Sequence, residues 1–224
     1  MDKAINPNDG QVYDINTWLK EFSSDKKGIC MVCGTDMKVR AENTPARTTH
    51  FWHVEENCNC PTILKNKVPY SDLEPTELDE ENAQLVKKQF SEQFYQIYMK
   101  CDYLCDGITF SEFKELIAKA TDKRVWYYKD LSIGYMPYIL LTIGGKFSSK
   151  TNPYRKRNFY FCFEANLRNF DDLWITTKLK KKIWKVYPDA PKEIEEFDIN
   201  FDYPTEPNWI KRSRSSIEKL LKLQ

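Results

Sequence analysis

Apolar side chains recur at helical spacing through the middle of the chain, and this pattern is the strongest structural signal in the sequence. Between residues 78 and 105 the apolar positions are mostly three, four or seven apart: Leu78, Leu85, Phe90, Phe94, Ile97, Cys101 and Leu104. Because an α-helix has about 3.6 residues per turn, these side chains share one face. We expect an amphipathic helix over about residues 77–105, with that face buried.

A second helix is predicted directly after the first. Gly107 ends the first run, and Thr109 with Glu112 three residues later forms a capping box, the side-chain signal that opens a helix. The apolar stripe that follows consists of Phe110, Phe113, Leu116 and Ile117. We expect a helix over about residues 110–121, which with the first helix makes a helical hairpin.

Beyond residue 123 the pattern becomes that of strands. Five runs rich in β-branched and aromatic residues predict strands: residues 124–129, 137–143, 158–165, 173–177 and 183–187. The run at 137–143 is apolar enough to predict a central strand buried on both faces. The acidic, proline-punctuated residues 188–207 predict a surface excursion before a last helix at about residues 211–223.

The chemistry of the amino-terminal part is carried by cysteine and histidine. Cys30 and Cys33, two residues apart and followed by Gly34, have the form of a zinc knuckle, in which two thiolates bind one ion while glycine permits a tight turn. The second pair of ligands comes from His50, His53, Cys58 and Cys60. A tetrahedral structural site needs four ligands, and the preferred set is Cys30, Cys33, His53 and Cys60.

Two of the six candidates remain as alternates. Cys58 and Cys60 are separated by one residue, a spacing that is rare for two ligands of one ion, so one of them stays unliganded. His50 and His53 enclose Phe51 and Trp52, which favours a strand or bend over a helical turn. His50 is the alternate histidine, with a supporting or functional role.

The predicted elements make an α+β protein with one structural Zn²⁺. Residues 1–68 form an amino-terminal helix, with Ile15, Trp18, Leu19 and Phe22 at helical spacing, and a zinc-binding module with a strand at residues 36–40. Residues 69–224 form an α+β domain, in which the helical hairpin precedes a mainly antiparallel sheet and a terminal helix. Residues 69–75, which contain two prolines, connect the two parts.

Composition indicates a reducing compartment. The chain has 7 cysteines, an odd number that disfavours a framework of disulfides. It has no apolar stretch long enough for a membrane helix, and Met1, Asp2 and Lys3 make a polar start unlike a signal peptide. We expect a cytoplasmic protein with no membrane partner.

Positive charge is concentrated in the carboxyl-terminal part. From residue 146 onward there are 17 Lys and Arg against 11 Asp and Glu, a net charge of +6 within a chain whose total is +1. Basic side chains interleaved with Tyr and Trp suit phosphate contacts and base stacking, although solvated lysine faces have the same composition. The candidate nucleic-acid-binding residues are Lys156, Arg157, Lys180, Lys181, Lys182, Trp184, Lys211 and Arg212.

The segment from Cys30-Met-Val-Cys33-Gly34 to His50-Phe-Trp-His53 resembles the amino-terminal zinc-finger region of the competence protein CoiA family. The resemblance covers about residues 28–64, and it implies that Cys30, Cys33 and His53 are metal ligands. In CoiA-like proteins this finger is joined to a nuclease-like domain, and the family is linked to the processing of incoming DNA. The resemblance therefore implies a prokaryotic or phage protein that acts near DNA.

No catalytic motif follows from the rest of the sequence. A restriction-type nuclease needs two carboxylates for Mg²⁺ and a lysine beside the attacked phosphate. Glu112-Phe113-Lys114 has the letters of that motif but lies in a predicted helix. Glu164, Asp171 and Asp172 lie near strand ends, yet no lysine follows at the required offset.

Three functions are consistent with these observations. The leading hypothesis is a zinc-binding, nucleic-acid-associated protein with no recognisable catalytic motif. The first alternative is a divergent metal-dependent nuclease that acts on foreign or mobile DNA. The second is a protein-interaction factor in phage defence or counter-defence, which would bind a protein partner through exposed aromatic side chains.

Overall fold

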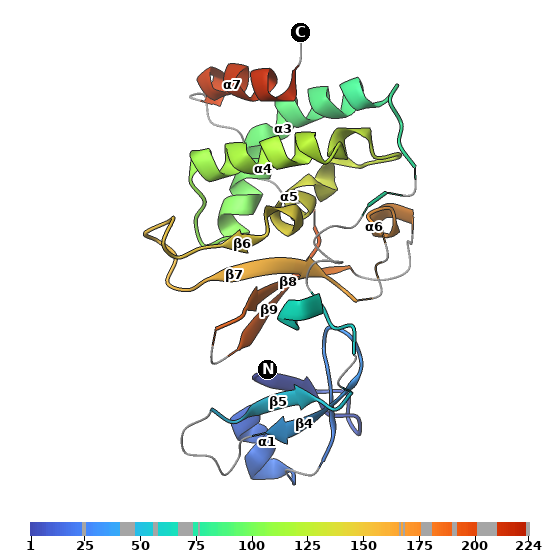
Figure 1. The fold of residues 1–224 in the computed structure, drawn as a ribbon, viewed down its shortest axis with the longest axis vertical. Helices are drawn as coiled ribbons and strands as arrows, with labels where there is room; N and C mark the ends of the chain where they lie inside the picture. The colour runs from blue at the N-terminus through green and yellow to red at the C-terminus, as the bar shows by residue number, and fades with distance from the viewer. Residues whose placement is uncertain are drawn as a thin grey trace.

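The computed structural model describes residues 1–23, 26–40, 48–55, 58–66, 74–75, 77–165, 167, 169–175, 181–189, 192–200 and 210–222. The described part is an α+β fold with two antiparallel sheets, as expected. Figure 1 shows three layers: a small amino-terminal sheet with its helix, a second sheet in the middle, and a layer of helices on the far side of that second sheet.

The amino-terminal layer is a five-stranded sheet of short strands in the order β2-β1-β3-β4-β5. The strands are β1 (Lys3–Ile5), β2 (Val12–Asp14), β3 (Gly28–Ile29), β4 (Asp36–Arg40) and β5 (His50–His53). Helix α1 (Ile15–Glu21) covers the sheet, and the Asp14 carboxylate caps its first turn. Trp18 of α1 is fully buried and packs edge-on against Phe51, with ring centroids 5.2 Å apart.

The helical layer follows only in part from the patterns that predict it, since Leu78 and Leu85, predicted on the buried face of the first helix, are exposed. Its helices are α3 (Ala83–Leu104), α4 (Phe110–Asp122), α5 (Met136–Gly144) and α7 (Lys211–Leu221). The capping box of Thr109 and Glu112 is present at the start of α4. No helix in the described ranges is both long enough and apolar enough to cross a membrane.

The second sheet lies between the two other layers. Its order is β6-β7-β8-β9, with β6 (Lys146–Phe147), β7 (Phe159–Phe163), β8 (Lys182–Tyr187) and β9 (Glu193–Asp198). Successive side chains of a strand point to opposite faces. Phe159, Phe161 and Phe163 accordingly join the core beneath the helices. Tyr160 and Cys162 join the apolar cluster of the amino-terminal layer.

Two of the predicted strands are helices in the structure. The prediction failed because a short apolar run does not distinguish a buried helix from a buried strand. The predicted central strand at 137–143 is wrong: these residues belong to α5, whose side chains from Met136 to Ile143 are all buried. A helix buried on every side is apolar throughout, as a central strand is, and Pro137 is tolerated in the first turn of a helix. The predicted strand at 173–177 is likewise wrong where it is described, since α6 (Asp172–Ile175) is helical.

The remaining differences concern boundaries and one strand. Residues 124–129 hold a 3₁₀ turn, Val125–Tyr127, instead of a strand. Helix α3 begins at Ala83 and not near residue 77, because Leu78 forms an isolated bridge with Tyr128. The predicted excursion at 188–207 contains strand β9, whose acidic side chains face basic ones on β8: Lys182 and Glu196 form an ion pair. Short 3₁₀ turns also occur at Leu64–Asn66 and Ile133–Tyr135.

Candidate metal centre

Four cysteine and histidine side chains converge inside the amino-terminal layer. Cys30 follows β3, Cys33 lies in the turn before β4, His53 ends β5, and Cys60 precedes the turn at Leu64–Asn66. Their ligand atoms all lie within 4.8 Å of one another. Cys30, His53 and Cys60 are buried, and Cys33 is partly exposed. This group could hold a metal ion, and it comprises the four residues that the sequence favoured.

The knuckle geometry follows from one glycine. Gly34 has a φ of +72°, a conformation that costs most L-residues energy but not glycine. Its N–H donates to the Cys30 carbonyl at 2.9 Å, and the Cys30 N–H donates to the Thr35 carbonyl at 2.9 Å. These two hydrogen bonds close the turn and direct the Cys30 and Cys33 side chains toward the shared candidate metal site.

The distances within the group are those of a compact set of ligands. The sulfurs of Cys30 and Cys60 are 3.9 Å apart, and the Cys33 sulfur is 3.4 Å from His53 Nε2. Two threonine hydroxyls approach from outside: Thr35 lies 3.1 Å from the Cys33 sulfur, and Thr62 lies 3.1 Å from the Cys60 sulfur. Hydroxyls so placed can donate to thiolates and stabilise them.

The pKa values of two thiols in the group are shifted in opposite directions. Hydrogen bonds from the Cys30 and Cys60 thiols lower the pKa of Cys33 far below the ordinary thiol value. The hydrogen bond to Cys33 in turn raises the pKa of Cys30, and burial adds to that shift. A metal ion binds thiolates, so occupation of the group would release protons from the thiols that hold them.

The second sheet holds the loop that carries Cys60. The Tyr160 hydroxyl, on β7, donates to the carbonyls of Pro61 and Thr62, each at 3.1 Å. Lys192 Nζ also donates to the Thr62 carbonyl. The knuckle is tied to the same sheet, because the Ala165 N–H donates to the Val32 carbonyl at 3.4 Å. The central layer therefore positions two of the segments that supply ligands.

The two alternates lie outside the group. His50 is three residues from His53 on the same strand, so the two rings point to opposite faces of the sheet. His50 Nδ1 is instead 2.8 Å from the Thr48 carbonyl. Cys58 is buried, and burial raises the pKa of its thiol. Thr35 and Thr62 were missed in the sequence, although both occur as the last residue of a Cys-x-Thr triplet.

The predicted nucleic-acid-binding positions on β8 and just before it do not form an open basic surface. Trp184 is 2% exposed and packs in the amino-terminal cluster, which leaves no ring face for a base. Lys181 Nζ donates to the Asp172 carbonyl, and Lys182 pairs with Glu196. Lys180 and the side chains of Lys211 and Arg212 lie outside what the structure describes.

Lys156 and Arg157 line a shallow pocket of about 350 Å³ beside Tyr154, whose side chain is 76% exposed. Three carboxylates share that pocket, namely Asp106, Glu193 and Glu195, and Arg157 is paired with Glu193 at 2.8 Å. The charge of Arg157 is therefore balanced by Glu193, while Asp106 and Glu195 pair with buried Lys185. The carboxylates weaken this pocket as a phosphate site.

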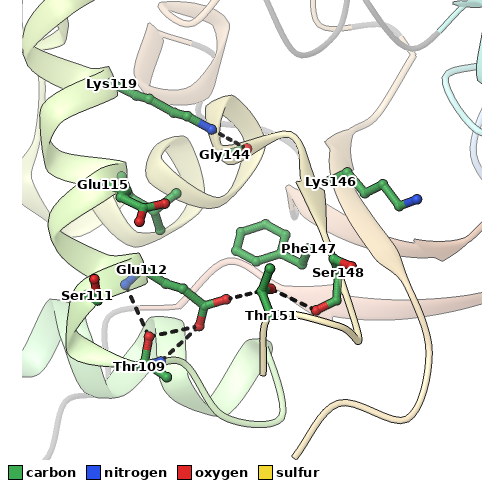
Figure 2. Close-up of a pocket in the computed structure, with 11 residues that line it drawn as sticks. Thr109, Ser111, Glu112, Glu115, Lys119, Gly144, Lys146, Phe147, Ser148 and Thr151 are labelled. Atoms are coloured by element: carbon green, nitrogen blue, oxygen red, sulfur yellow. Dashed lines mark hydrogen bonds between the residues drawn. The ribbon is translucent and has the colours of Figure 1, made fainter. Parts of the chain in front are cut away.

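The Glu112-Phe113-Lys114 sequence has a structural role, because the Glu112 carboxylate is held by hydrogen bonds within the fold. Figure 2 shows the Glu112 carboxylate turned toward Thr109, whose N–H donates to it at 3.0 Å, and toward Thr151. Buried Arg155 donates to both carboxylate oxygens, at 2.6 and 3.1 Å. Lys114 is directed elsewhere, with its ammonium 5.7 Å from the Phe110 ring centroid. A carboxylate with its acceptor positions filled in this way is a poor ligand for Mg²⁺.

The other acidic candidates, Glu164, Asp171 and Asp172, do not belong to a group of described residues that could hold a metal ion. Asp171 is 2% exposed, and Asp172 sits at the start of α6, where its carboxylate accepts from the Asn169 N–H at 3.4 Å. Burial raises the pKa of Glu164. In the described ranges, the side chains that meet as a possible metal site are the three cysteines and His53, and no carboxylate belongs to the group.

Comparisons of the chain with protein-family models, with curated proteins and with solved structures find no match. The site must therefore be interpreted from its own residues.

Proposed function

We propose that the four-residue group binds one structural Zn²⁺ and that the protein associates with nucleic acid. The spacing of the ligand atoms carries the zinc proposal. Two thiolates held at about 2.3 Å by a tetrahedral ion lie about 3.8 Å apart, and a thiolate and an imidazole nitrogen lie about 3.6 Å apart. The corresponding distances are 3.9 Å for Cys30 and Cys60 and 3.4 Å for Cys33 and His53.

The donor set favours zinc in a structural role. Three thiolates and one imidazole are a typical set for structural zinc, and soft sulfur ligands disfavour Mg²⁺ and Ca²⁺. Four protein ligands complete a tetrahedron, so no position stays open for water or substrate. The strands around the site have two to five residues each. Such a layer buries little apolar surface, and the ion would supply the missing stability.

Nucleic-acid association is supported by charge, by resemblance and by one surface. The carboxyl-terminal part carries the excess of Lys and Arg, and the segment around the four ligands resembles the CoiA finger region. The outer face of the amino-terminal sheet carries basic and aromatic side chains together. The nuclease alternative has no comparable support, because the carboxylates that would serve it are engaged in the fold or lie apart.

The test combines elemental analysis with a binding assay. We expect about one zinc per chain in the purified protein, loss of that zinc in Cys60→Ser, and retention of it in Cys58→Ser, the matched control outside the group. The zinc-loaded protein should bind short DNA or RNA with an affinity that falls steeply between 50 and 200 mM salt, because phosphate contacts release counterions.

Zinc absent from the wild-type protein, or retained fully by Cys60→Ser, would contradict the metal assignment. Zinc present without any nucleic-acid binding would contradict the association and leave the metal assignment standing. Binding whose affinity does not depend on salt would also contradict the proposed association, because that association relies on phosphate contacts.

A further inference from the structure

The outer face of the β4–β5 pair brings basic and aromatic side chains together. In the antiparallel register Lys38 is opposite Trp52, and Arg40 is opposite His50. Side chains two apart on a strand share a face, so these four lie together. Met37, Phe51 and His53 point the other way, into the buried cluster and the metal group. Lys38, Arg40 and Trp52 are exposed, and His50 is half-buried.

Trp52 presents a large apolar ring to solvent. Its side chain is 48% exposed, although tryptophan is usually buried, and an exposed indole on a rigid strand is typical of a binding surface. The Arg40 guanidinium lies 4.4 Å from the ring centroid, which is cation–π distance. This contact restrains the indole and places a positive charge over one face of the ring, so a base would stack on the opposite face.

A pocket of about 430 Å³ opens beside the ring. Its lining includes Trp52, His50, Ile63 and Lys65, together with Met1, Phe51 and the candidate ligand His53. Lys65 is exposed, and Lys192 at the pocket donates to the Thr62 carbonyl. Glu55 is the carboxylate in the lining. Asp36, on the neighbouring strand, is neutralised by Lys27 at 2.7 Å. The surroundings of the ring are therefore mainly apolar and cationic.

We propose that this face binds single-stranded nucleic acid, with an unpaired base stacked on Trp52 and the flanking phosphates held by Lys38, Arg40 and Lys65. A flat ring flanked by cations suits a base and its phosphates, whereas bases in a duplex are already stacked and present no free ring. The inference rests on the proposed function, because His53 on β5 is one of the zinc ligands. The metal would thus fix the strand that carries the stacking ring.

The test uses the full zinc-loaded chain and a fluorescent oligothymidylate of about fifteen nucleotides, with the duplex of the same length as competitor. Trp52→Ala should weaken binding of the single strand roughly 5- to 150-fold, the range for one lost base–aromatic stack. Trp52→Phe should recover part of the loss because it restores a ring. Tyr103→Ala, which removes an exposed ring from α3 in the helical layer, should bind as the wild type does.

A charge variant tests the phosphate contacts independently. Lys38→Glu should weaken binding and reduce the slope of log affinity against log salt. Zinc content is measured for every variant, and it should stay at the wild-type level because both side chains point away from the metal group.

The outcomes separate the inference from the proposed function. Wild-type affinity in Trp52→Ala, in a protein that binds nucleic acid and retains zinc, overturns the stacking site and leaves the association intact. Tighter binding of the duplex than of the single strand also overturns it. No binding by the zinc-loaded wild type overturns both.

Discussion

The two faces of the central sheet lie in cores of different construction. On the helical side, Phe159, Phe161 and Phe163 belong to a large apolar cluster built with α3, α4 and α5. On the other side, Tyr160 and Cys162 belong to a smaller cluster that contains two of the four candidate ligands, Cys30 and Cys60, with Cys33 packed against it. One half of the molecule is thus stabilised by a large aromatic and aliphatic core, whereas the other has a smaller apolar core, around Trp18 and Phe51, to which the proposed metal would add. Different perturbations should therefore break them.

The largest effect is expected from metal removal. Structural zinc contributes about 10–16 kcal/mol in small zinc-finger domains, more than the stability of a typical domain. A strong chelator should therefore unfold the amino-terminal sheet while much of the helical layer stays folded. Hydrogen exchange resolved by segment would show protection lost in β1 to β5 and retained in α3 and α4. Equal protection of both regions with and without chelator would contradict the contrast.

A cavity on the helical side should have the next largest effect. Phe161 is fully buried, so Phe161→Ala should lower the free energy of unfolding by about 3–5 kcal/mol. Cys162→Ala, the adjacent residue on the module side, removes much less volume and should cost far less. Urea unfolding of both zinc-loaded variants measures the difference, and similar losses would mean that the two faces do not differ as described.

The buried ion pair of Glu112 and Arg155 sharpens the description of the helical half. The Arg155 side chain is 0% exposed, so Glu112→Gln leaves its charge without a counterion and should cost about 3–5 kcal/mol. The exposed pair of Arg124 and Glu80 provides a matched control, and Glu80→Gln should leave stability close to that of the wild type. Denaturant unfolding at neutral pH compares the two variants.

Zinc affinity should depend on the hydroxyl of Thr62, which can be replaced by a methyl group. Thr62→Val removes the hydroxyl that lies 3.1 Å from the Cys60 sulfur, with little change in volume. Zinc affinity should fall roughly 10- to 100-fold, as for other partners that support a ligand. Competition with a chromogenic chelator measures this, and Thr121→Val, whose hydroxyl caps a carbonyl in α4, should leave zinc affinity unchanged.

The smallest effect is the pH dependence contributed by one carboxylate of the helical half, Glu112. Burial alone would raise the pKa of Glu112, but the hydrogen bonds from Arg155 and the Thr109 N–H lower it below the ordinary 4.5. A lowered pKa in the folded state means that the ionised form stabilises the fold. This contribution is complete above pH 4.5 and is lost as the pH falls through the folded pKa. The gap in unfolding free energy between wild type and Glu112→Gln should therefore narrow in acid.

Local signals account for what the sequence predicted well. The capping box at Thr109 and Glu112 depends on two residues three apart, and it marks the start of α4 in the structure. Cys30, Cys33 and Gly34 specify a turn by their spacing alone. The choice of His53 over His50 is a matter of strand alternation, and the structure places the two rings on opposite faces.

Features that depend on distant partners were not predictable. The residues of α5 carry no polar face, because helices and the sheet surround them, so nothing distinguishes the helix from a buried strand. Trp184 has basic neighbours in sequence, yet it is buried because the amino-terminal layer covers that face of β8. Lys38, Arg40, His50 and Trp52 are grouped by the pairing of two strands, which the linear pattern does not reveal.

The bonds from Tyr160 to Pro61 and Thr62 also have a consequence for biosynthesis. The hydroxyl and the Pro61 carbonyl are separated by 99 residues of chain. At about 5–20 residues per second, the ribosome delivers Tyr160 roughly 5–20 s after the loop it will hold. During that interval the loop that carries Cys60 lacks the partner that covers one of its sides. Early binding of a metal ion would keep the nascent segment ordered until the central sheet has been synthesised.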